Sequence, residues 1–409
     1  MTFYPRWQVT AVREALKTRR VVVLSGPRQC GKTTLAMQIV NDGGNVYRTL
    51  DDASMLKIAR TDPLGFLRHD IGALIIDEVQ KAPDLIPAIK QIVDEDNKNG
   101  QFLLTGSSDI FRRPDVTESL AGRVKHARLR VLSFGEQMNT PPVFLTNAFA
   151  GNFPFQIKGF DKREIIKMAF AGGYPEVLAL IPEKRADWLL DYVESIIARD
   201  LRDVANIRRQ NSLRRLLDTF ASWSGKLMDT QGVSGRLDLN RSTLNAYTNV
   251  LESLYLLERL PAWTETDYQR AGQREKIFMT DTGLMAALLD WREEEVFWDA
   301  DRSGKIIETM VFNELSAQVS LGRDCRIHHF RDRENREIDF LISGRRGDLL
   351  GIEVKAGSAV SGEDARHLKW FKNKLAEERP FSGVVLYTGE NTLPLGEGIT
   401  AVPIACLWS

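Results

Sequence analysis

The chain has 409 residues, enough for roughly two to four domains that each bury a core of their own. Lys and Arg together number 55, as do Asp and Glu, so no overall charge indicates a nucleic-acid-binding protein, and any such contact needs a local patch. The hydrophobic fraction of 43% and the charged fraction of 27% are those of a soluble globular protein.

The cysteines and the N-terminus bear on where the protein resides. Cys30, Cys325 and Cys406 are odd in number and scattered, which argues against a disulfide framework and against a zinc site. The N-terminus lacks the pattern of a signal peptide, and the sequence has no apolar run of the roughly 18 residues that a membrane span needs. We therefore expect a cytoplasmic protein without a membrane partner.

The most specific motif follows the apolar run at 21–24, which predicts a buried strand, and precedes a segment with a helical pattern. Its glycines permit a tight turn whose backbone N–H groups wrap phosphate oxygens. Lys32 would reach the β- and γ-phosphates, and Thr33 would offer its hydroxyl to Mg²⁺. The sequence therefore predicts an ATP-binding P-loop made of Gly26, Pro27, Arg28, Gln29, Cys30, Gly31, Lys32, Thr33 and Thr34.

A second apolar run, at 73–76, ends in the carboxylates of Asp77 and Glu78. Such a run is typical of a parallel strand buried on both faces, whose carboxyl end opens onto the ligand crevice. We expect Asp77 to hold the Mg²⁺ shell and Glu78 to polarise the attacking water. An isolated Asp-Glu pair is more often a solvated strand end, but the preceding P-loop favours the catalytic interpretation.

Two further residues are candidates for contact with the γ-phosphate. The apolar run at 102–104 ends in small polar residues, of which Ser107 is the leading candidate for a sensor, with Thr105 and Ser108 as competitors. Arg123 could stabilise the charge that develops in phosphoryl transfer. The alternative for Arg123 is a salt-bridged surface residue.

The segment at 227–260 has a pattern resembling a helix-turn-helix. Asn240 is a good N-cap for a helix that carries apolar residues at core spacing, namely Leu244, Leu251 and Leu254. The opposite face of this helix would show polar residues typical of a recognition helix, namely Arg241, Ser242, Asn245 and Asn249. Winged-helix modules of ATPases also serve as lids and protein contacts, so both uses stay open.

The last hundred residues hold a candidate metal site. Glu308 lies amid a helical apolar stripe, Asp339 lies in a strand-like segment, and Glu353 and Lys355 share one face of the next strand. Carboxylates of this kind hold a divalent metal in nucleases, with the Lys orienting the attacking water. The alternative is a nuclease-like fold kept as a docking module, with its charges neutralised internally.

These motifs together resemble those of the bacterial and archaeal AAA-type ATPases that join a P-loop core to a C-terminal domain of unknown function with a restriction-endonuclease-like fold. The matching pieces span nearly the full chain: the P-loop and segments 75–81, 104–108, 119–123, 173–176, 281–284, 337–340 and 352–355. The resemblance implies ATP binding and hydrolysis, a P-loop core with an additional strand, and a role for Arg123 as a trans-acting finger or sensor. One departure is Ile338, where the nuclease superfamily usually has Pro.

The expected fold class is α/β, with a P-loop AAA-type core around a parallel sheet. We expect the core at 1–145, a helical linker or lid at 146–225, a winged-helix-like segment at 226–280, and a restriction-endonuclease-like α/β domain at 281–409. The leading hypothesis is a Mg²⁺-dependent ATPase, a homo-oligomer, that acts on a macromolecule, most plausibly DNA. The alternatives are a nucleotide-gated module that binds a protein partner, as in toxin neutralisation or signalling, and an ATP-regulated nuclease.

Overall fold

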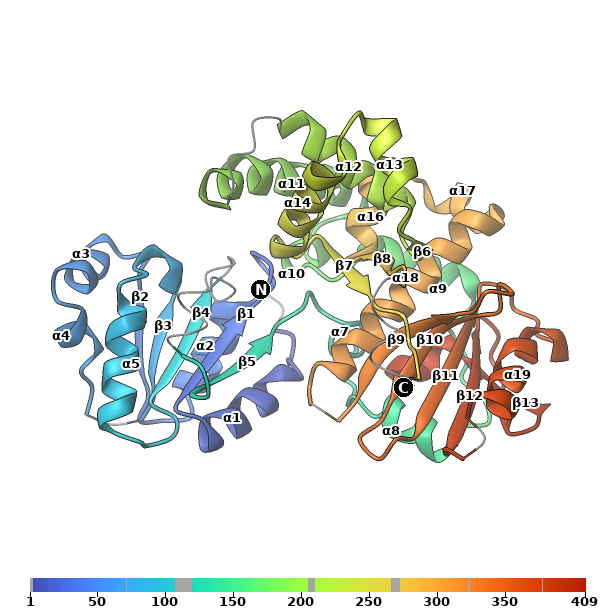
Figure 1. The fold of residues 1–409 in the computed structure, drawn as a ribbon, viewed down its shortest axis with the longest axis horizontal. Helices are drawn as coiled ribbons and strands as arrows, with labels where there is room; N and C mark the ends of the chain where they lie inside the picture. The colour runs from blue at the N-terminus through green and yellow to red at the C-terminus, as the bar shows by residue number, and fades with distance from the viewer. Residues whose placement is uncertain are drawn as a thin grey trace. The chain divides into compact units, whose positions relative to one another are not determined.

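The computed structural model describes residues 3–70, 72–106, 120–204, 210–265, 273–322, 324–376 and 378–409. These residues divide into two compact units (Figure 1). The N-terminal unit consists of Arg6–Val131 with Ser253–Tyr255, and the C-terminal unit consists mainly of Leu132–Glu252 and Leu256–Ser409.

The N-terminal unit is built on a sheet of five parallel strands in the order β2-β3-β4-β1-β5. The strands are β1 (Val21–Ser25), β2 (Val46–Thr49), β3 (Leu74–Asp77), β4 (Phe102–Gly106) and β5 (Val124–Arg128). Because β4 lies between β1 and β3, the sheet has the additional strand that the resemblance implied. The apolar runs behind the predicted motifs are these central strands, and they are buried.

Helices cover both faces of this sheet (Figure 1). They are α1 (Gln8–Thr18), α2 (Lys32–Val40), α3 (Ala53–Thr61), α4 (Pro63–Leu67) and α5 (Leu85–Glu95), with a 3₁₀ turn, η1, at Val79–Lys81. Apolar side chains of α4 and α5 share a core with Val21, Val23 and Ile76, whereas α1 and α2 pack against the sheet from its other side. The P-loop therefore leaves a strand and enters a helix that are both held by packing.

The C-terminal unit begins with helices: α7 (Phe134–Gln137), α8 (Phe144–Ala150), α9 (Lys162–Ala171), α10 (Pro175–Leu178), α11 (Pro182–Val204), α12 (Gln210–Ser222), α13 (Thr230–Leu237) and α14 (Arg241–Ser253). A small antiparallel sheet is made of β6 (Lys226–Leu227), which lies between α12 and α13, and of β7 (Leu257–Leu260) and β8 (Lys276–Met279), which follow α14. The strand order is β6-β8-β7. Asn240 caps α14, since its side chain accepts the N–H of Thr243 at 2.8 Å. The predicted core residues of α14 are buried, namely Leu244, Leu251 and Leu254.

The end of the chain forms a mixed sheet of six strands in the order β13-β14-β12-β11-β10-β9. Its strands are β9 (Arg326–Arg331), β10 (Glu337–Ser343), β11 (Leu349–Lys355), β12 (Phe381–Tyr387), β13 (Leu393–Gly396) and β14 (Ile399–Pro403). The accompanying helices are α16 (Thr282–Leu288), α17 (Glu293–Trp298), α18 (Ala300–Val319), α19 (Arg366–Lys374) and the 3₁₀ turns η3 (Gly362–Ala365) and η4 (Ile404–Trp408). Side chains of α18 pack with Phe340 and Ile352, and those of α19 pack with Leu341 and Leu349.

The N-terminal unit ends at Val131, earlier than the boundary expected at residue 145, because the next residues are tied to the C-terminal unit. The N–H of Leu132 donates to the carbonyl of Gly173 at 2.8 Å, and the N–H of Phe134 donates to the carboxylate of Glu314. Burial raises the pKa of Glu314 to about 8. A boundary set by such distant partners has no local signal in the sequence.

Two motifs of the resemblance form one structural tie. Asp281 is buried, and its carboxylate accepts the N–H groups of Gly173 and Leu284, both at 2.7 Å. Burial raises the pKa of Asp281 to about 6. A Cβ at position 173 would lie 2.2 Å from the carbonyl oxygen of Leu132, so the chain approaches here too closely for any residue but Gly. These residues have a packing role.

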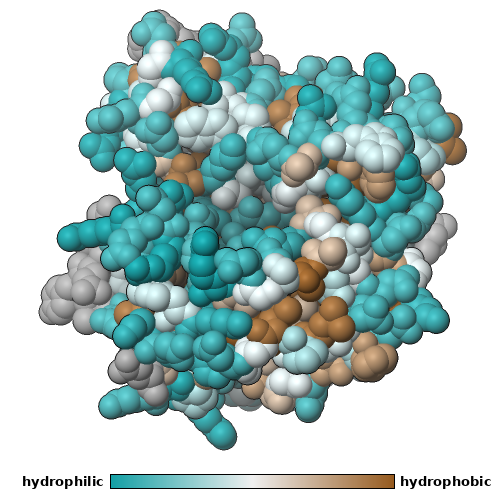
Figure 2. Space-filling model, turned by 90° about the vertical axis from the view of Figure 1, so that its right-hand side faces the viewer, coloured by the Kyte–Doolittle hydropathy of each residue, from teal (hydrophilic) through white to brown (hydrophobic). Residues whose placement is uncertain are grey.

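Among the described residues, no helix is long and apolar enough to cross a membrane. On the face drawn in Figure 2, hydrophilic side chains cover most of the surface, and hydrophobic ones gather in a few places.

Candidate nucleotide-binding site and carboxylate cluster

The P-loop joins the carboxyl end of β1 to the N-terminus of α2. Gly31 caps α2 in the left-handed region, with φ 99°, where a residue with a side chain is strained. A Cβ at Gly26 would lie 2.2 Å from the carbonyl oxygen of Leu129, so this position also requires glycine. The loop thus has the side-chain-free backbone and the helix N-terminus that bind phosphate.

Lys32 lies at the first position of α2 and is only 5% exposed. Its ammonium donates to the carbonyl oxygens of Gly26 at 3.0 Å and Pro27 at 2.7 Å, both within the loop. A buried ammonium held by neutral carbonyls retains a strong preference for an anion. Its position fits the phosphate-binding role that the sequence predicted.

Arg6 supports the loop from outside the motif. Its guanidinium donates to the carbonyl of Cys30 through Nη1 and to the carbonyl of Arg130 through Nη2, the latter at 2.6 Å. Sequence reasoning missed this residue, since a single Arg before a helix carries no motif.

Thr33 and Asp77 meet at the carboxyl edge of the sheet, as the strand-end argument predicted. The Thr33 hydroxyl donates to the Asp77 carboxylate at 2.9 Å. Two more hydroxyls donate to this buried carboxylate, that of Tyr47 at 2.7 Å and that of Thr105. Burial, together with the bond to Asp77, raises the pKa of Tyr47 far above its usual value, so its phenol stays a neutral donor. Tyr47 was not predicted, because one aromatic residue in a short strand gives no chemical signal.

Glu78 follows Asp77 in the left-handed region, with φ 58°. Its N–H donates to the Thr105 hydroxyl at 3.4 Å, and its carboxylate accepts a hydrogen bond from the amide of Gln80. A non-glycine residue in this conformation is strained, and such residues concentrate at functional sites.

The two predicted γ-phosphate residues differ in what can be said of them. Ser107 lies outside the described residues. Arg123 directly precedes β5, whose first residue, Val124, pairs with Val21, the first residue of β1. Arg123 therefore lies at the amino ends of the strands, whereas the P-loop lies at their carboxyl ends, roughly 15 Å away along β1. Its guanidinium binds the Asp94 carboxylate, with Nη2 at 3.0 Å. Arg123 therefore cannot reach a phosphate on its own P-loop, and only action in trans stays a prediction.

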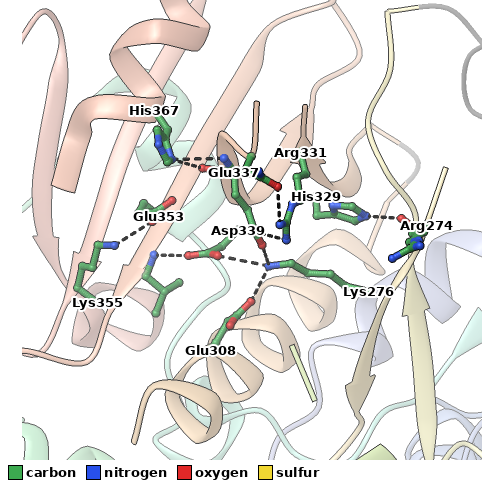
Figure 3. A network of polar contacts seen from close by, with 12 residues as sticks. Arg274, Lys276, Glu308, His329, Arg331, Glu337, Asp339, Glu353, Lys355 and His367 are labelled. Atoms are coloured by element: carbon green, nitrogen blue, oxygen red, sulfur yellow. Dashed lines mark hydrogen bonds and ion pairs between the residues drawn. The ribbon is translucent and has the colours of Figure 1, made fainter. Parts of the chain in front are cut away.

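The C-terminal candidate residues converge on one region of the mixed sheet (Figure 3). β10 and β11 pair antiparallel with Phe340 opposite Ile352, which puts Asp339 opposite Glu353. Lys355 donates to Glu353 at 2.9 Å, and the second oxygen of Asp339 accepts the N–H of Val354 at 2.9 Å.

An unpredicted residue, Lys276, lies at the centre of the carboxylates. Its ammonium lies 2.9 Å from Glu308, 2.7 Å from Glu337 and 3.4 Å from Asp339. Burial alone would lower the pKa of Lys276, but these carboxylates outweigh it and raise the pKa well above its usual value. No cluster of three His, Cys, Asp or Glu side chains within the described ranges is arranged to hold a metal ion. The residues therefore do not fit the second metal site expected from the sequence.

Burial shifts the pKa of two carboxyl groups of the cluster upward. It raises the pKa of Glu308 to about 7 against the opposing charge of Lys276, and the pKa of Glu353 to about 8. The Nε2–H of His329 donates to the carbonyl of Arg274 at 3.0 Å, and burial, reinforced by Lys276, lowers the pKa of His329 to about 4. His329 is therefore neutral and adds no charge to the cluster.

Three parts of the chain match known families. Residues 18–138 match the AAA domain, and residues 162–295 and 303–407 match two domains of unknown function, DUF8612 and DUF4143. An uncharacterized protein of Mycobacterium tuberculosis is 26% identical over 396 residues, which cover 96% of this chain and 82% of the relative. An uncharacterized protein of Haemophilus influenzae is 22% identical over 360 residues, covering 82% of each chain.

Two solved structures show limited similarity. The Walker-type ATPase PABY2304 of Pyrococcus abyssi aligns with a TM-score of 0.39 and 13% identity over 69% of this chain and 94% of that one. The RuvB Holliday junction branch migration motor of Thermotoga maritima aligns with a TM-score of 0.29 and 19% identity over 66% and 95%. The AAA match, the parallel sheet and the P-loop together support an AAA-type P-loop ATPase, as the sequence predicted.

Proposed function

We propose that the protein is a Mg²⁺-dependent ATPase that couples ATP binding and hydrolysis to action on a macromolecule, most plausibly DNA. The observation that carries the ATPase part is the hydrogen bond of 2.9 Å between Thr33 and Asp77, formed beside the buried ammonium of Lys32. This arrangement brings the predicted phosphate-binding and metal-binding groups to one edge of the sheet.

Each residue has a distinct role in this proposal. Lys32 and the N–H groups of the P-loop bind the phosphates, while Thr33 and Asp77 hold Mg²⁺. When bound, Mg²⁺ neutralises the negative charge that develops on the phosphates during phosphoryl transfer. Glu78 orients and polarises the attacking water after leaving the amide of Gln80.

The DNA part rests on the helix pair and hairpin of the C-terminal unit. α13, α14 and the antiparallel strands β7 and β8 follow the order of a winged helix. All four polar residues predicted for the outer face of α14 are exposed. Arg241 and Asn245 border a groove of about 760 Å³, and their side chains make no ion pair or hydrogen bond with the described part of the chain. Asn249 instead accepts a hydrogen bond from Arg259 at 2.8 Å.

The competing proposal is a nucleotide-gated module that binds a protein partner and hydrolyses ATP slowly. The observation that favours it is Lys276, whose ammonium neutralises the carboxylates that a nuclease would use. In both proposals the protein is cytoplasmic and forms a homo-oligomer in which Arg123 acts on the neighbouring subunit.

The deciding experiment measures ATPase rate with and without duplex, single-stranded and branched DNA, with Lys32→Ala as the inactive control. DNA stimulation that falls in Arg241→Ala and Asn245→Ala supports the DNA proposal. ATPase activity that no DNA changes favours the protein-binding module, and the absence of Lys32-dependent hydrolysis refutes both. Mass in solution with a non-hydrolysable ATP analogue tests assembly.

A further inference from the structure

The charge cluster around Lys276 is closed by residues from three separate elements. Lys276 begins β8, Glu308 lies on α18, and Glu337 and Asp339 lie on β10. The Lys276 side chain is only 2% exposed, although Lys is among the residues least often buried. An ammonium has three N–H donors, and here three carboxylates lie within 3.4 Å of it.

The distances around Lys276 are those of hydrogen bonds between an ammonium and carboxylates. Charge-assisted hydrogen bonds of this kind are about 2.7 to 2.9 Å long. Glu308 and Glu337 lie 2.9 and 2.7 Å from the Lys276 nitrogen. The cluster is therefore arranged around a hydrogen-bonded cation.

The second carboxylate oxygens of Asp339 and Glu308 have little freedom to turn toward a metal. Asp339 uses its second oxygen to accept the N–H of Val354 on the neighbouring strand. A Cβ at Gly225 would lie 2.8 Å from the second oxygen of Glu308, so the backbone of Gly225 closes that side. Glu353 pairs with a different cation, Lys355. The three carboxylates of the predicted metal site are thus divided between two lysines, Glu308 and Asp339 pairing with Lys276 and Glu353 with Lys355.

We propose that Lys276 is a built-in counter-ion that takes the place of a divalent metal among Glu308, Glu337 and Asp339. In this arrangement the C-terminal domain binds no metal at the cluster and does not cleave nucleic acid by a metal-dependent reaction. The ammonium also ties β8 to the mixed sheet and to α18, so the cluster serves as a structural joint. This inference is independent of the ATPase activity.

The test compares metal binding and thermal stability of full-length proteins without nucleotide. All carry Asp77→Asn, which removes the carboxylate expected to hold Mg²⁺ at the P-loop site. The probe is Mn²⁺, followed by calorimetry and by its electron paramagnetic resonance. The protein with native Lys276 should bind no Mn²⁺ at the cluster up to millimolar concentration. Lys276→Met leaves Glu308 and Asp339 without their ion pair, while Glu337 keeps Arg331 at 3.3 Å. The variant should have a melting temperature lower by roughly 10 °C and should gain one Mn²⁺ site that restores stability.

Matched variants make the result specific. Lys355→Met removes the partly exposed lysine beside Glu353 and should gain no Mn²⁺ site, and Asp339→Asn added to Lys276→Met should weaken the gained site at least tenfold. Mn²⁺ binding by the protein with native Lys276 that Asp339→Asn abolishes overturns the proposal. So does a Lys276→Met protein that keeps the native melting temperature and binds no Mn²⁺. If Lys276→Met does not fold even with Mn²⁺, the Mn²⁺ titration of the protein with native Lys276 decides: no binding at the cluster supports the proposal, and binding that Asp339→Asn abolishes overturns it.

Discussion

The Tyr47 hydroxyl predicts how the nucleotide site depends on magnesium. Tyr47 donates to Asp77 at 2.7 Å from the edge strand β2, and the substitution Tyr47→Phe removes this donor while keeping the ring. Among the described residues, Asp77 then keeps Thr33 and Thr105 as hydroxyl donors. Because Thr33 is expected to turn to Mg²⁺ in the active complex, Thr105 alone would orient the carboxylate there.

The size of the effect follows from the charge of the acceptor. A hydrogen bond to a charged group contributes about 1.5 to 3 kcal/mol, and 1.4 kcal/mol corresponds to a factor of about ten in an equilibrium constant. Solvent at a partly buried site reduces this, so we expect Tyr47→Phe to raise the Mg²⁺ concentration for half-maximal ATPase activity by about tenfold. ATP binding in the absence of Mg²⁺ should change little, because Lys32 and the P-loop backbone are unaltered.

The assay is ATPase rate against free Mg²⁺ at saturating ATP, beside nucleotide binding in chelator. Tyr387→Phe is the matched control, since it also removes a phenol hydrogen bond, to the carbonyl of Asn391 at 2.6 Å, but in the C-terminal unit. A Tyr47→Phe protein whose Mg²⁺ dependence stays within twofold of the native one refutes the positioning role. An equal shift in Tyr387→Phe would show that the effect is one of general stability.

Three further predictions test the remaining residues. Lys32→Ala should abolish ATP binding, whereas Glu78→Gln should bind ATP and lose hydrolysis; a Glu78→Gln protein of native turnover contradicts the assignment. Arg123→Ala should turn over ATP about 10³-fold more slowly and regain activity when mixed with Lys32→Ala; no recovery, with a monomeric mass, leaves Arg123 only its ion pair with Asp94. Folding raises the pKa of Glu314 to about 8, so the stability that its protonated form contributes is present below its ordinary pKa and is lost as the pH rises toward 8. Glu314→Gln should therefore flatten the fall in melting temperature between these two pH values, and an unchanged fall contradicts this assignment.

The nucleotide site could be predicted from the sequence because its chemistry lies within a few consecutive residues. The P-loop contains the turn, the Lys and the hydroxyl in one stretch, and a parallel strand carries Asp77 to the same edge of the sheet. The meeting of Thr33 with Asp77 follows from that geometry even though 44 residues separate them.

Other residues could not be predicted, because their partners are distant and no spacing marks them. Lys276 lies 32 residues from Glu308 and 63 from Asp339, and a single Lys at the start of a strand looks like a surface residue. The carboxylates were recognised by residue type and spacing, but whether a metal or an ammonium balances them depends on tertiary packing. The motif around Arg123 predicted a position near a phosphate, whereas the strand register puts Arg123 at the amino ends of the strands, away from the P-loop.

Arg6 connects the P-loop directly to the end of the N-terminal unit's main segment. Its rigid guanidinium joins the carbonyl of Cys30, inside the P-loop, to that of Arg130, which precedes the last residue of the unit's main segment. If phosphate binding moves the Cys30 peptide, either one of the two Arg6 hydrogen bonds must break or the Arg130 peptide must move as well. The displacement then reaches the chain where it leaves the unit at Val131, without crossing α2 or the sheet. A movement of the P-loop would thus be transmitted by the Arg6 side chain to the segment that leaves the unit at Val131.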